Sequence, residues 1–274
     1  MVEPQFRSPT ATLARSRLVA KKSLSQNFLA DAAIARSILE ALPSEPGSII
    51  EIGAGPGTMT RALGQSRERV AAVELDPRLV AVLRREVAGI GTVSVTEGDA
   101  LKLPLADLLP APYAVFGNIP YHVTGLLVPR LLALHPAPEW VCVLVQLEVA
   151  ERLCAAPGGW SLATLAVRSA ASAELLLRVP RRAFEPAPKV DSALVMLHPH
   201  PRVDFADSAF FDFARAVFQE RRKKLSNAVA NAFGHDLARG REVVRRSGLD
   251  EMRRPQTLDL DEWAALYRAY LEVA

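Results

Sequence analysis

The sequence predicts an α/β fold with a mostly parallel sheet, followed by a smaller helical region. Short apolar, β-branched runs occur at residues 48–52, 69–74, 92–96, 112–116 and 140–145. Segments with helical spacing separate these runs, and such alternation is typical of parallel strands joined by right-handed crossovers. Residues 173–179 and 192–198 are also strand-like, but no helical segment separates them. We therefore expect an antiparallel pair at the edge of the sheet.

Three parts are expected along the chain. The strand signal ends near residue 200, and residues 205–274 have helical spacing interrupted by glycines. We therefore assign residues 21–200 to the sheet-containing domain and residues 201–274 to a helical domain. Residues 1–20 are basic and almost free of acidic side chains, which indicates a flexible arm, with a mitochondrial transit segment as the alternative.

The composition indicates a globular protein of a reducing compartment. Half of the 274 residues are hydrophobic and 23% are charged, which excludes a wholly disordered chain. No apolar run is long enough for a membrane-spanning helix. Cys142 and Cys154 do not form a Cys-x-x-Cys pair, which favours core positions in a cytoplasmic protein. His135, His198 and His200 show no metal-ligand spacing, so no metal site is expected.

The net charge of +3 is distributed unevenly. Residues 1–22 contain five Arg or Lys and one Glu, and residues 215–254 contain eleven Arg or Lys against five Asp or Glu. The remainder of the chain is therefore acidic. Two basic segments on an acidic body fit contact with a nucleic-acid backbone, and solvated helix faces are the alternative.

A glycine-rich loop follows the first predicted strand. Its Gly53-Ala54-Gly55-Pro56-Gly57 spacing differs from the Gly-x-Gly-x-x-Gly of dinucleotide sites. Glu51 precedes the loop, Glu74 ends the second strand and Asp99 follows the third. The Glu74 carboxylate suits the two ribose hydroxyls of a nucleoside, and Asp99 suits its adenine amino group. Because these acids would repel a pyrophosphate, the ligand they favour is a cationic sulfonium.

This arrangement resembles that of the class I S-adenosylmethionine-dependent methyltransferases. The resemblance implies a Rossmann-like, mostly parallel seven-stranded sheet with an antiparallel edge strand. It also implies that S-adenosylmethionine is the cofactor of residues 21–200.

The segment Asn118-Ile119-Pro120-Tyr121 follows the fourth predicted strand. It is similar to the Asn/Asp-Pro-Pro-Tyr motif of amino-methyltransferases. The lone pair of an adenine amino group is delocalised into the ring and attacks poorly. Acceptors such as the Asn118 side-chain oxygen and the Ile119 carbonyl would hold the N–H groups and direct the lone pair toward a methyl donor. Proline stiffens the loop, and Tyr121 can stack on an unpaired base.

Three further segments resemble motifs of one family. Residues 21–29 end in Gln-Asn-Phe-Leu, residues 184–192 read Phe-Glu-Pro-Ala-Pro-Lys-Val-Asp-Ser, and residues 218–224 read Phe-Gln-Glu-Arg-Arg-Lys-Lys. With the two loops, they occur in the order found in ribosomal RNA adenine dimethyltransferases. The resemblance runs from about residue 20 to the C-terminus, and it is strongest to the bacterial small-subunit, or KsgA, family.

This resemblance implies dimethylation of two adjacent adenines near the 3′ end of 16S rRNA in an assembling 30S subunit. A monomeric, RNA-binding enzyme that also acts in ribosome biogenesis is expected. The implied catalytic residues are Asn118, Ile119, Pro120, Tyr121 and Phe184. The implied cofactor contacts are Asn27, Leu29, Gly53, Gly55, Glu74, Asp99 and Asn118. The expected RNA contacts are Lys21, Lys22, Arg221, Arg222, Lys223 and Lys224.

Two positions depart from the family pattern. Ser25 stands where glycine is usual, and residues 224–227 read Lys-Leu-Ser-Asn where Thr-Leu-Arg-Asn is more usual. Two other functions stay open on the sequence: a 23S rRNA adenine methyltransferase of the macrolide-resistance type, and a non-catalytic RNA-binding assembly factor. A nucleotide-dependent oxidoreductase is disfavoured by the glycine spacing.

Overall fold

The computed structural model describes residues 6–21, 24, 26–201 and 203–274. Unit 1 consists of Met1–Ala150 and Ala173–Pro199, and unit 2 consists of Glu151–Ser172 and His200–Ala274. The second crossing from unit 1 to unit 2 falls between Pro199 and His200, close to the boundary expected near residue 200. The structure differs from the expectation for residues 151–172, which belong to the helical unit. The reason is packing, because Trp160 and Leu165 lie in the core of that unit.

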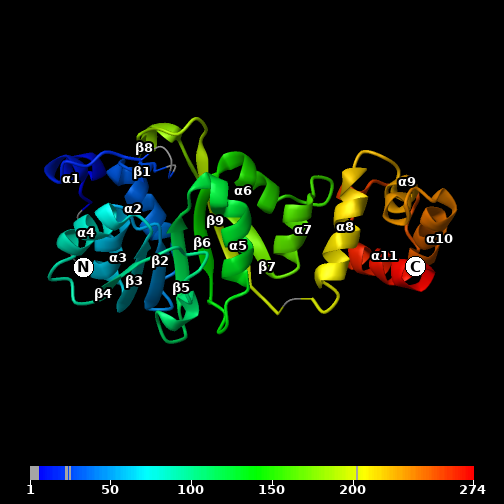
Figure 1. The fold of residues 1–274 in the computed structure, drawn as a ribbon, viewed down its shortest axis with the longest axis horizontal. Helices are drawn as coiled ribbons and strands as arrows, with labels where there is room; N and C mark the ends of the chain where they lie inside the picture. The colour runs from blue at the N-terminus through cyan, green and yellow to red at the C-terminus, as the bar shows by residue number, and fades with distance from the viewer. Residues whose placement is uncertain (1–5, 22–23, 25, 202) are drawn as a thin grey trace. The chain divides into compact units, whose positions relative to one another are not determined.

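Within the described residues, the sheet of unit 1 has seven strands in the order β4-β3-β2-β5-β6-β9-β7 (Figure 1). Their bounds are β2 Ser48–Ile52, β3 Arg69–Glu74, β4 Val93–Glu97, β5 Ala114–Asn118, β6 Val141–Gln146, β7 Ala171–Val179 and β9 Ser192–Pro199. Strands β2 to β6 pair in parallel, whereas β9 pairs antiparallel with β6 and is followed by β7 at the edge. The predicted mostly parallel α/β sheet is confirmed.

The central strands are buried on both faces, which explains their mostly apolar sequences. Ile49 and Ile50 of β2 are completely buried. Ile52, the last residue of β2, pairs with Val73 of β3 and with Gly117 of β5. The carboxyl ends of these three strands therefore align at one edge of the sheet, where ligands bind in open α/β folds.

Helices connect the strands of unit 1. Their bounds are α2 Ala32–Ala41, α3 Thr58–Ser66, α4 Pro77–Glu86, α5 Thr124–Leu132 and α6 Leu147–Leu153, with short 3₁₀-helices η2 Leu105–Asp107, η3 Tyr121–Val123 and η4 Arg181–Ala183. The Asp76 side chain caps α4 by accepting from the N–H of Arg78, and Pro77 occupies the first helical position. Both features fix the start of α4 directly after β3.

The N-terminal segment contains a helix, α1 Pro9–Arg15, where the sequence suggested a flexible arm. The Ser8 side chain caps it, and Leu13 is 7% exposed. A two-stranded antiparallel sheet follows, formed by β1 Phe28–Leu29 and β8 Phe184–Glu185. The helix forms because Leu13 finds an apolar partner surface on α4 and β1, which residues 1–20 alone do not reveal.

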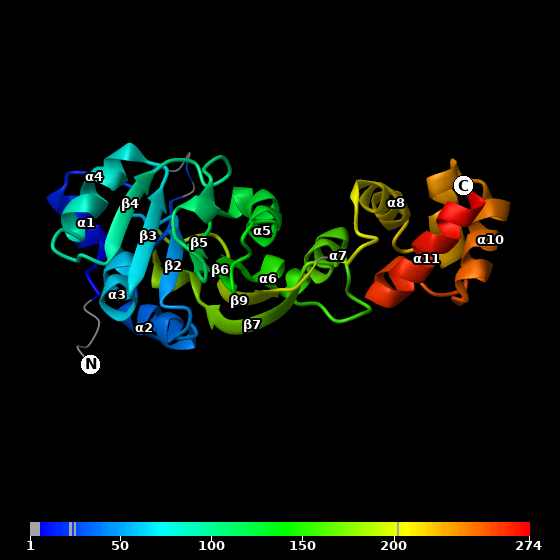
Figure 2. The same cartoon turned by 90° about the horizontal axis from the view of Figure 1, so that it is seen from below.

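Unit 2 is helical and has its own core (Figure 2). Its elements are α7 Leu162–Arg168, α8 Ser208–Gln219, α9 Leu225–Ala230, η5 Asn231–Phe233, α10 Leu237–Ser247, η6 Pro255–Thr257 and α11 Leu260–Val273. Phe210 and Phe213 of α8 pack against Trp263 and Tyr267 of α11, mostly edge to face. No helix in the described part of the chain is long and apolar enough to cross a lipid bilayer.

Candidate active site

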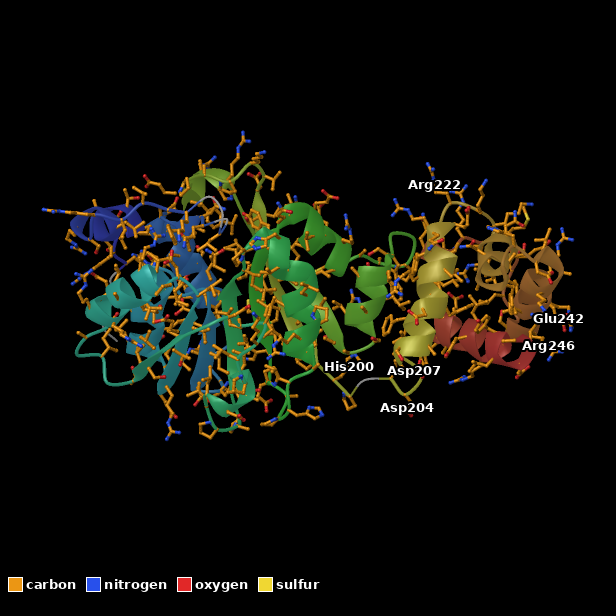
Figure 3. The ribbon with its side chains drawn as sticks, in the orientation of Figure 1. His200, Asp204, Asp207, Arg222, Glu242 and Arg246 are labelled. Carbon is orange, nitrogen blue, oxygen red and sulfur yellow. The ribbon has the colours of Figure 1, made fainter. Side chains whose placement is uncertain are left out.

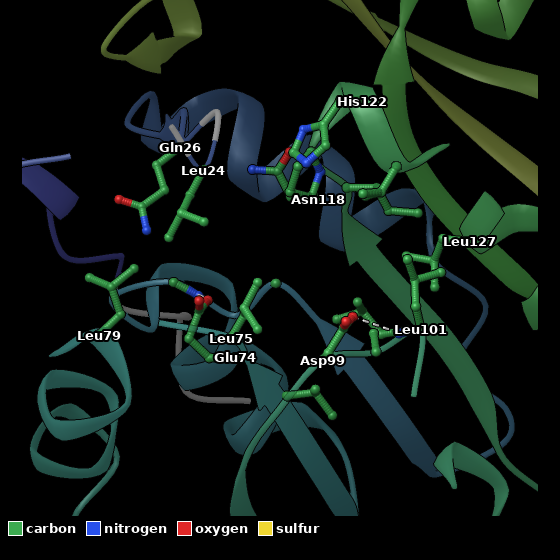
Figure 4. A pocket seen from close by; sticks show the side chains of 18 of the residues that line it. Leu24, Gln26, Glu74, Leu75, Leu79, Asp99, Leu101, Asn118, His122 and Leu127 are labelled. Atoms are coloured by element: carbon green, nitrogen blue, oxygen red, sulfur yellow. Dashed lines mark hydrogen bonds between the residues drawn. The ribbon is translucent and has the colours of Figure 1, made fainter. Parts of the chain in front are cut away.

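A cavity lies at the carboxyl ends of β2, β3, β4 and β5, at the edge where these strands align (Figure 4). The loops after the strands and the segment before β1 line it. Most of the residues predicted from the sequence lie here together: Asn27, Gly53, Gly55, Glu74, Asp99, Asn118, Ile119, Pro120 and Tyr121. Segments up to 94 positions apart in sequence therefore form one site.

The glycine loop must be free of side chains at two positions. Gly53 has φ +73°, and a Cβ there would lie 3.0 Å from the backbone oxygen of Asn118. Gly55 has φ +58°, and its Cβ would lie 3.1 Å from the ring of Phe28. Glycine is the residue that tolerates both the left-handed backbone and the close approach. The loop is thereby held between β5 and the segment leading into β1.

Glu74 is oriented by backbone donors. Its Oε2 accepts from the N–H of Gly55 at 2.8 Å, and its Oε1 accepts from the N–H of Asp76 at 2.9 Å. The residue is 7% exposed, and burial raises the pKa of its carboxyl while these hydrogen bonds oppose the shift. Each carboxylate oxygen still has a free lone pair that can accept a hydroxyl group.

Asp99 lies in the cavity on the same side as Glu74, and Asn118 and His122 lie across from them (Figure 4). The Asp99 Oδ1 accepts from the N–H of Leu101 at 2.9 Å, which fixes the carboxylate at the end of β4. Its side chain is 33% exposed and can accept a further hydrogen bond from a ligand.

Asn118 and Tyr121 are each held by one hydrogen bond. The Asn118 Nδ2 donates to the backbone oxygen of Asn27 at 3.2 Å, which leaves Oδ1 as the acceptor of this amide. The Tyr121 hydroxyl lies 2.8 Å from Oγ of the completely buried Ser192. Burial raises the pKa of Tyr121, so the phenol is neutral at physiological pH. The loop thus presents an amide oxygen and a neutral aromatic ring.

Two predicted site residues lie elsewhere. Leu29 and Phe184 are paired between β1 and β8, each is 4% exposed, and both belong to the large core of unit 1. Neither lines the cavity. The Phe184 ring lies among other apolar side chains, and its role opposite Tyr121 stays a prediction.

Other residues were not predicted from the sequence but line or support the cavity. Phe28, Leu75 and Leu79 supply apolar lining. The Gln26 Nε2 donates to Oδ2 of Asp76 at 3.1 Å, which links the segment before β1 to the start of α4. Hydrogen bonds from Arg78, above all, lower the pKa of Asp76 to about 2. Gln26 lies in the motif at residues 21–29 and Ser192 ends the motif at residues 184–192, but the sequence does not show what they contact.

The cavity fits a nucleoside carrying a positive charge. Carboxylates of Glu74 and Asp99 offer acceptors, Leu75 and Leu79 offer apolar contact, and the cradle at Gly53 would be filled by any side chain. These are the features that hold adenosine with a sulfonium group. Across the described ranges, no group of three His, Cys, Asp or Glu side chains is arranged to hold a metal ion.

The predicted RNA contacts fall into two sets. Lys21 is exposed in unit 1, whereas Lys22, like Ser25, lies outside the described residues. Residues 221–224 are exposed between α8 and α9 of unit 2, and none of their side chains forms an ion pair with a described residue. By contrast, Arg245 and Arg246 of α10 each lie 2.7 Å from Glu242 (Figure 3). Among the described residues of unit 2, residues 221–224 are therefore a run of four neighbouring cations without an ion pair.

The sheet order and the cavity at its carboxyl edge define a class I methyltransferase. A family model described as ribosomal RNA adenine dimethylase matches residues 17–266. The chain therefore belongs to the ribosomal RNA adenine dimethylase family of S-adenosylmethionine-dependent methyltransferases.

Individual relatives agree with this family. The chain is 39% identical over 259 residues to the ribosomal RNA small subunit methyltransferase A of Desulfitobacterium hafniense, covering 92% of this chain and 93% of that protein. It is 36% identical over 275 residues to the protein of the same name from Geobacillus thermodenitrificans, covering 94% of each.

Two solved structures share the fold over nearly their whole length. The crystal structure of a dimethyladenosine transferase from Plasmodium falciparum has a TM-score of 0.75 and 25% identity, covering 90% of this chain and 98% of that one. The crystal structure of the 23S rRNA methyltransferase ErmE has a TM-score of 0.65 and 26% identity, covering 89% and 99%.

Proposed function

We propose that this protein dimethylates the exocyclic amino groups of two adjacent adenines near the 3′ end of 16S rRNA. The observation that carries the proposal is that Asn118 lies in the same cavity as Glu74 and Asp99, with its Oδ1 free to accept. The names of the relatives from Desulfitobacterium hafniense and Geobacillus thermodenitrificans support the small subunit as the source of the substrate.

The cofactor would be held by the carboxyl edge of the sheet. Glu74 would accept from the ribose hydroxyls and Asp99 from the adenine amino group, while Gly53 and Gly55 allow the close approach of the backbone. Asn27 contributes by receiving the hydrogen bond that orients Asn118. When bound, S-adenosylmethionine supplies an electrophilic methyl group.

The substrate adenine would be oriented by the loop after β5. Asn118 Oδ1 and the Ile119 carbonyl would accept its two N–H bonds, which raises the electron density on nitrogen and stabilises the positive charge that develops there. Pro120 stiffens the loop, and Tyr121 would stack on the base with its hydroxyl held by Ser192. Because the amino group loses its proton after attack, no strong base is needed.

The RNA would also be bound outside the cavity. The unpaired cations at residues 221–224 and Lys21 would contact phosphates of an assembling 30S subunit. A monomeric, cytoplasmic enzyme that takes part in small-subunit biogenesis fits this substrate.

The test is methyl transfer to defined ribosomal particles. The protein is incubated with tritium-labelled S-adenosylmethionine and with 30S subunits or 50S precursors that lack the modification, and the labelled nucleotides are mapped. Dimethyladenosine at two neighbouring adenines of 16S rRNA, absent with Asn118→Ala, is the expected result. Label in 23S rRNA alone would identify an enzyme of the resistance type. RNA binding without transfer to either would identify a non-catalytic assembly factor.

A further inference from the structure

We infer that helix α1, clamped to Glu86 of α4, is a brace that sets the affinity of the cofactor cavity. This inference rests on the proposed cofactor and extends it to a segment outside the family match, because α1 ends at Arg15 and the match begins at residue 17. The helix lies beside α4 in both views of the fold (Figures 1 and 2).

The clamp is an ion-pair cluster at the end of α4. The Glu86 carboxylate receives Arg7 Nη1 on Oε2 at 2.9 Å and Arg15 Nη2 on Oε1 at 3.1 Å. The Glu86 side chain is 13% exposed, so solvent screens these pairs less than it would on an open surface. Arg85, the neighbouring residue, donates from Nη2 to Ser16 Oγ at 2.9 Å. Both ends of α1 are therefore fixed to the same turn of α4.

The clamp holds an apolar contact that reaches the cavity. Leu13 of α1 packs with Phe28 and Leu79 in a small buried cluster. Phe28 and Leu79 line the cavity, and the Phe28 ring faces Gly55 across the position of its absent Cβ. One side of each of these two side chains thus meets α1, and another side meets the space that the cofactor would occupy.

Loss of α1 would remove the apolar part of the support for the segment before β1. Its other ties include the hydrogen bonds from Gln26 to Asp76 and from Asn118 to the backbone oxygen of Asn27, and the two-residue pairing of β1 with β8. Without Leu13, the surfaces of Phe28 and Leu79 that contact α1 would be exposed to water. Both side chains would then change their positions in the lining of the cavity. The result is a weaker and faster-dissociating cofactor complex. Arg7, Arg15, Leu13 and Glu86 are positioning residues in this account, since none of them lines the cavity.

The test is direct binding of S-adenosylhomocysteine to the full chain by titration calorimetry. Glu86→Gln is expected to weaken binding about five-fold, as the loss of two ion pairs of this exposure predicts. Glu242→Gln is the matched control, because Glu242 also receives two arginines but lies on α10 of unit 2. It is expected to leave the dissociation constant unchanged. Added salt should weaken binding to the wild-type chain and have less effect on Glu86→Gln.

A second variant addresses the apolar part of the brace. Leu13→Ala is expected to weaken binding about ten-fold while the circular dichroism spectrum and the melting of unit 2 stay unchanged. Equal affinity of the wild-type chain, Glu86→Gln and Leu13→Ala would overturn the brace and leave the proposed function intact. Failure of the wild-type chain to bind S-adenosylhomocysteine would overturn both. Binding that follows the expected pattern, with methylation of another RNA, would support the brace and contradict only the proposed substrate.

Discussion

The hydroxyl of Tyr121 lies 2.8 Å from Oγ of Ser192, which ties the loop after β5 to the first residue of β9. Ser192 is completely buried, whereas Tyr121 is among the residues that line the cavity. Because β9 is paired on both sides, between β6 and β7, this hydrogen bond holds the aromatic ring against a fixed part of the sheet. Ser192 is therefore a positioning residue for the ring expected to stack on the substrate base.

Ser192→Ala should lower kcat about five-fold, which corresponds to the loss of one hydrogen bond, with a smaller change in the affinity for S-adenosylhomocysteine. Tyr121→Phe removes the same bond from the other side. The double variant should therefore be no slower than either single variant when single-turnover methyl transfer is measured. Additive losses would show that the two side chains act independently.

Gly53→Ala should disrupt the cavity through the backbone of Asn118. The left-handed φ alone costs about 1 kcal/mol for alanine, and contact with the Asn118 oxygen should add about 1–2 kcal/mol. Gly89→Ala is a matched control, because Gly89 has φ +85° but no atom within 4 Å of its Cβ position. Urea unfolding and S-adenosylhomocysteine titration measure both variants. Equal destabilisation and equal binding would contradict the close approach as the reason for glycine at residue 53.

Glu51 should make stability fall as pH rises from 5 to 8. Its carboxyl is 2% exposed, and burial raises its pKa to about 8 in the folded chain, from about 4.5 in an unfolded one. Between these values the folded state binds the extra proton, so deprotonation costs up to about 1.4 kcal/mol per pH unit. Glu51→Gln, which mimics the protonated form, should flatten this part of the curve in urea unfolding. Parallel curves for the two proteins would show that Glu51 is ionised in the fold.

Arg222→Gln should weaken binding to 16S rRNA and lower the slope of log affinity against log salt by about 1. Arg246→Gln should change neither quantity, because Arg246 is already paired with Glu242 and Glu272 (Figure 3). Filter binding over a range of salt concentrations measures both. Similar effects of the two substitutions would favour a diffuse positive field over contacts at residues 221–224.

The sheet and most of the cavity were predictable from the sequence, because their signals are local. The buried strands β2 and β3 are short, mostly apolar runs, and acids and glycines stand at their ends and in the loops that follow them. Parallel pairing then brings the ends of these strands to one edge whatever the details of packing.

The remaining features depend on contacts between distant segments. Leu29 and Phe184 belong to the motifs at residues 21–29 and 184–192. The pairing of β1 with β8 joins these residues, which are 155 positions apart, and both are buried in the core. Leu13 lies in a basic segment for which the sequence predicts a flexible arm. In the structure it packs against Phe28 and Leu79, which are distant in sequence. Neither burial nor docking of this kind has a local sequence signal.

We expect Asn118 Oδ1 to orient the amino group of the substrate adenine in the cavity that would also hold the cofactor. The most direct measurement compares single-turnover methyl transfer to unmodified 30S subunits by the wild-type chain, Asn118→Asp and Asn118→Ala, alongside S-adenosylhomocysteine binding by each. Asn118→Ala should lower the rate at least about 100-fold and the affinity less than about ten-fold, and Asn118→Asp, which keeps an acceptor oxygen, should retain more activity. A wild-type rate in Asn118→Ala, or a loss of rate matched by an equal loss of affinity, would contradict the account.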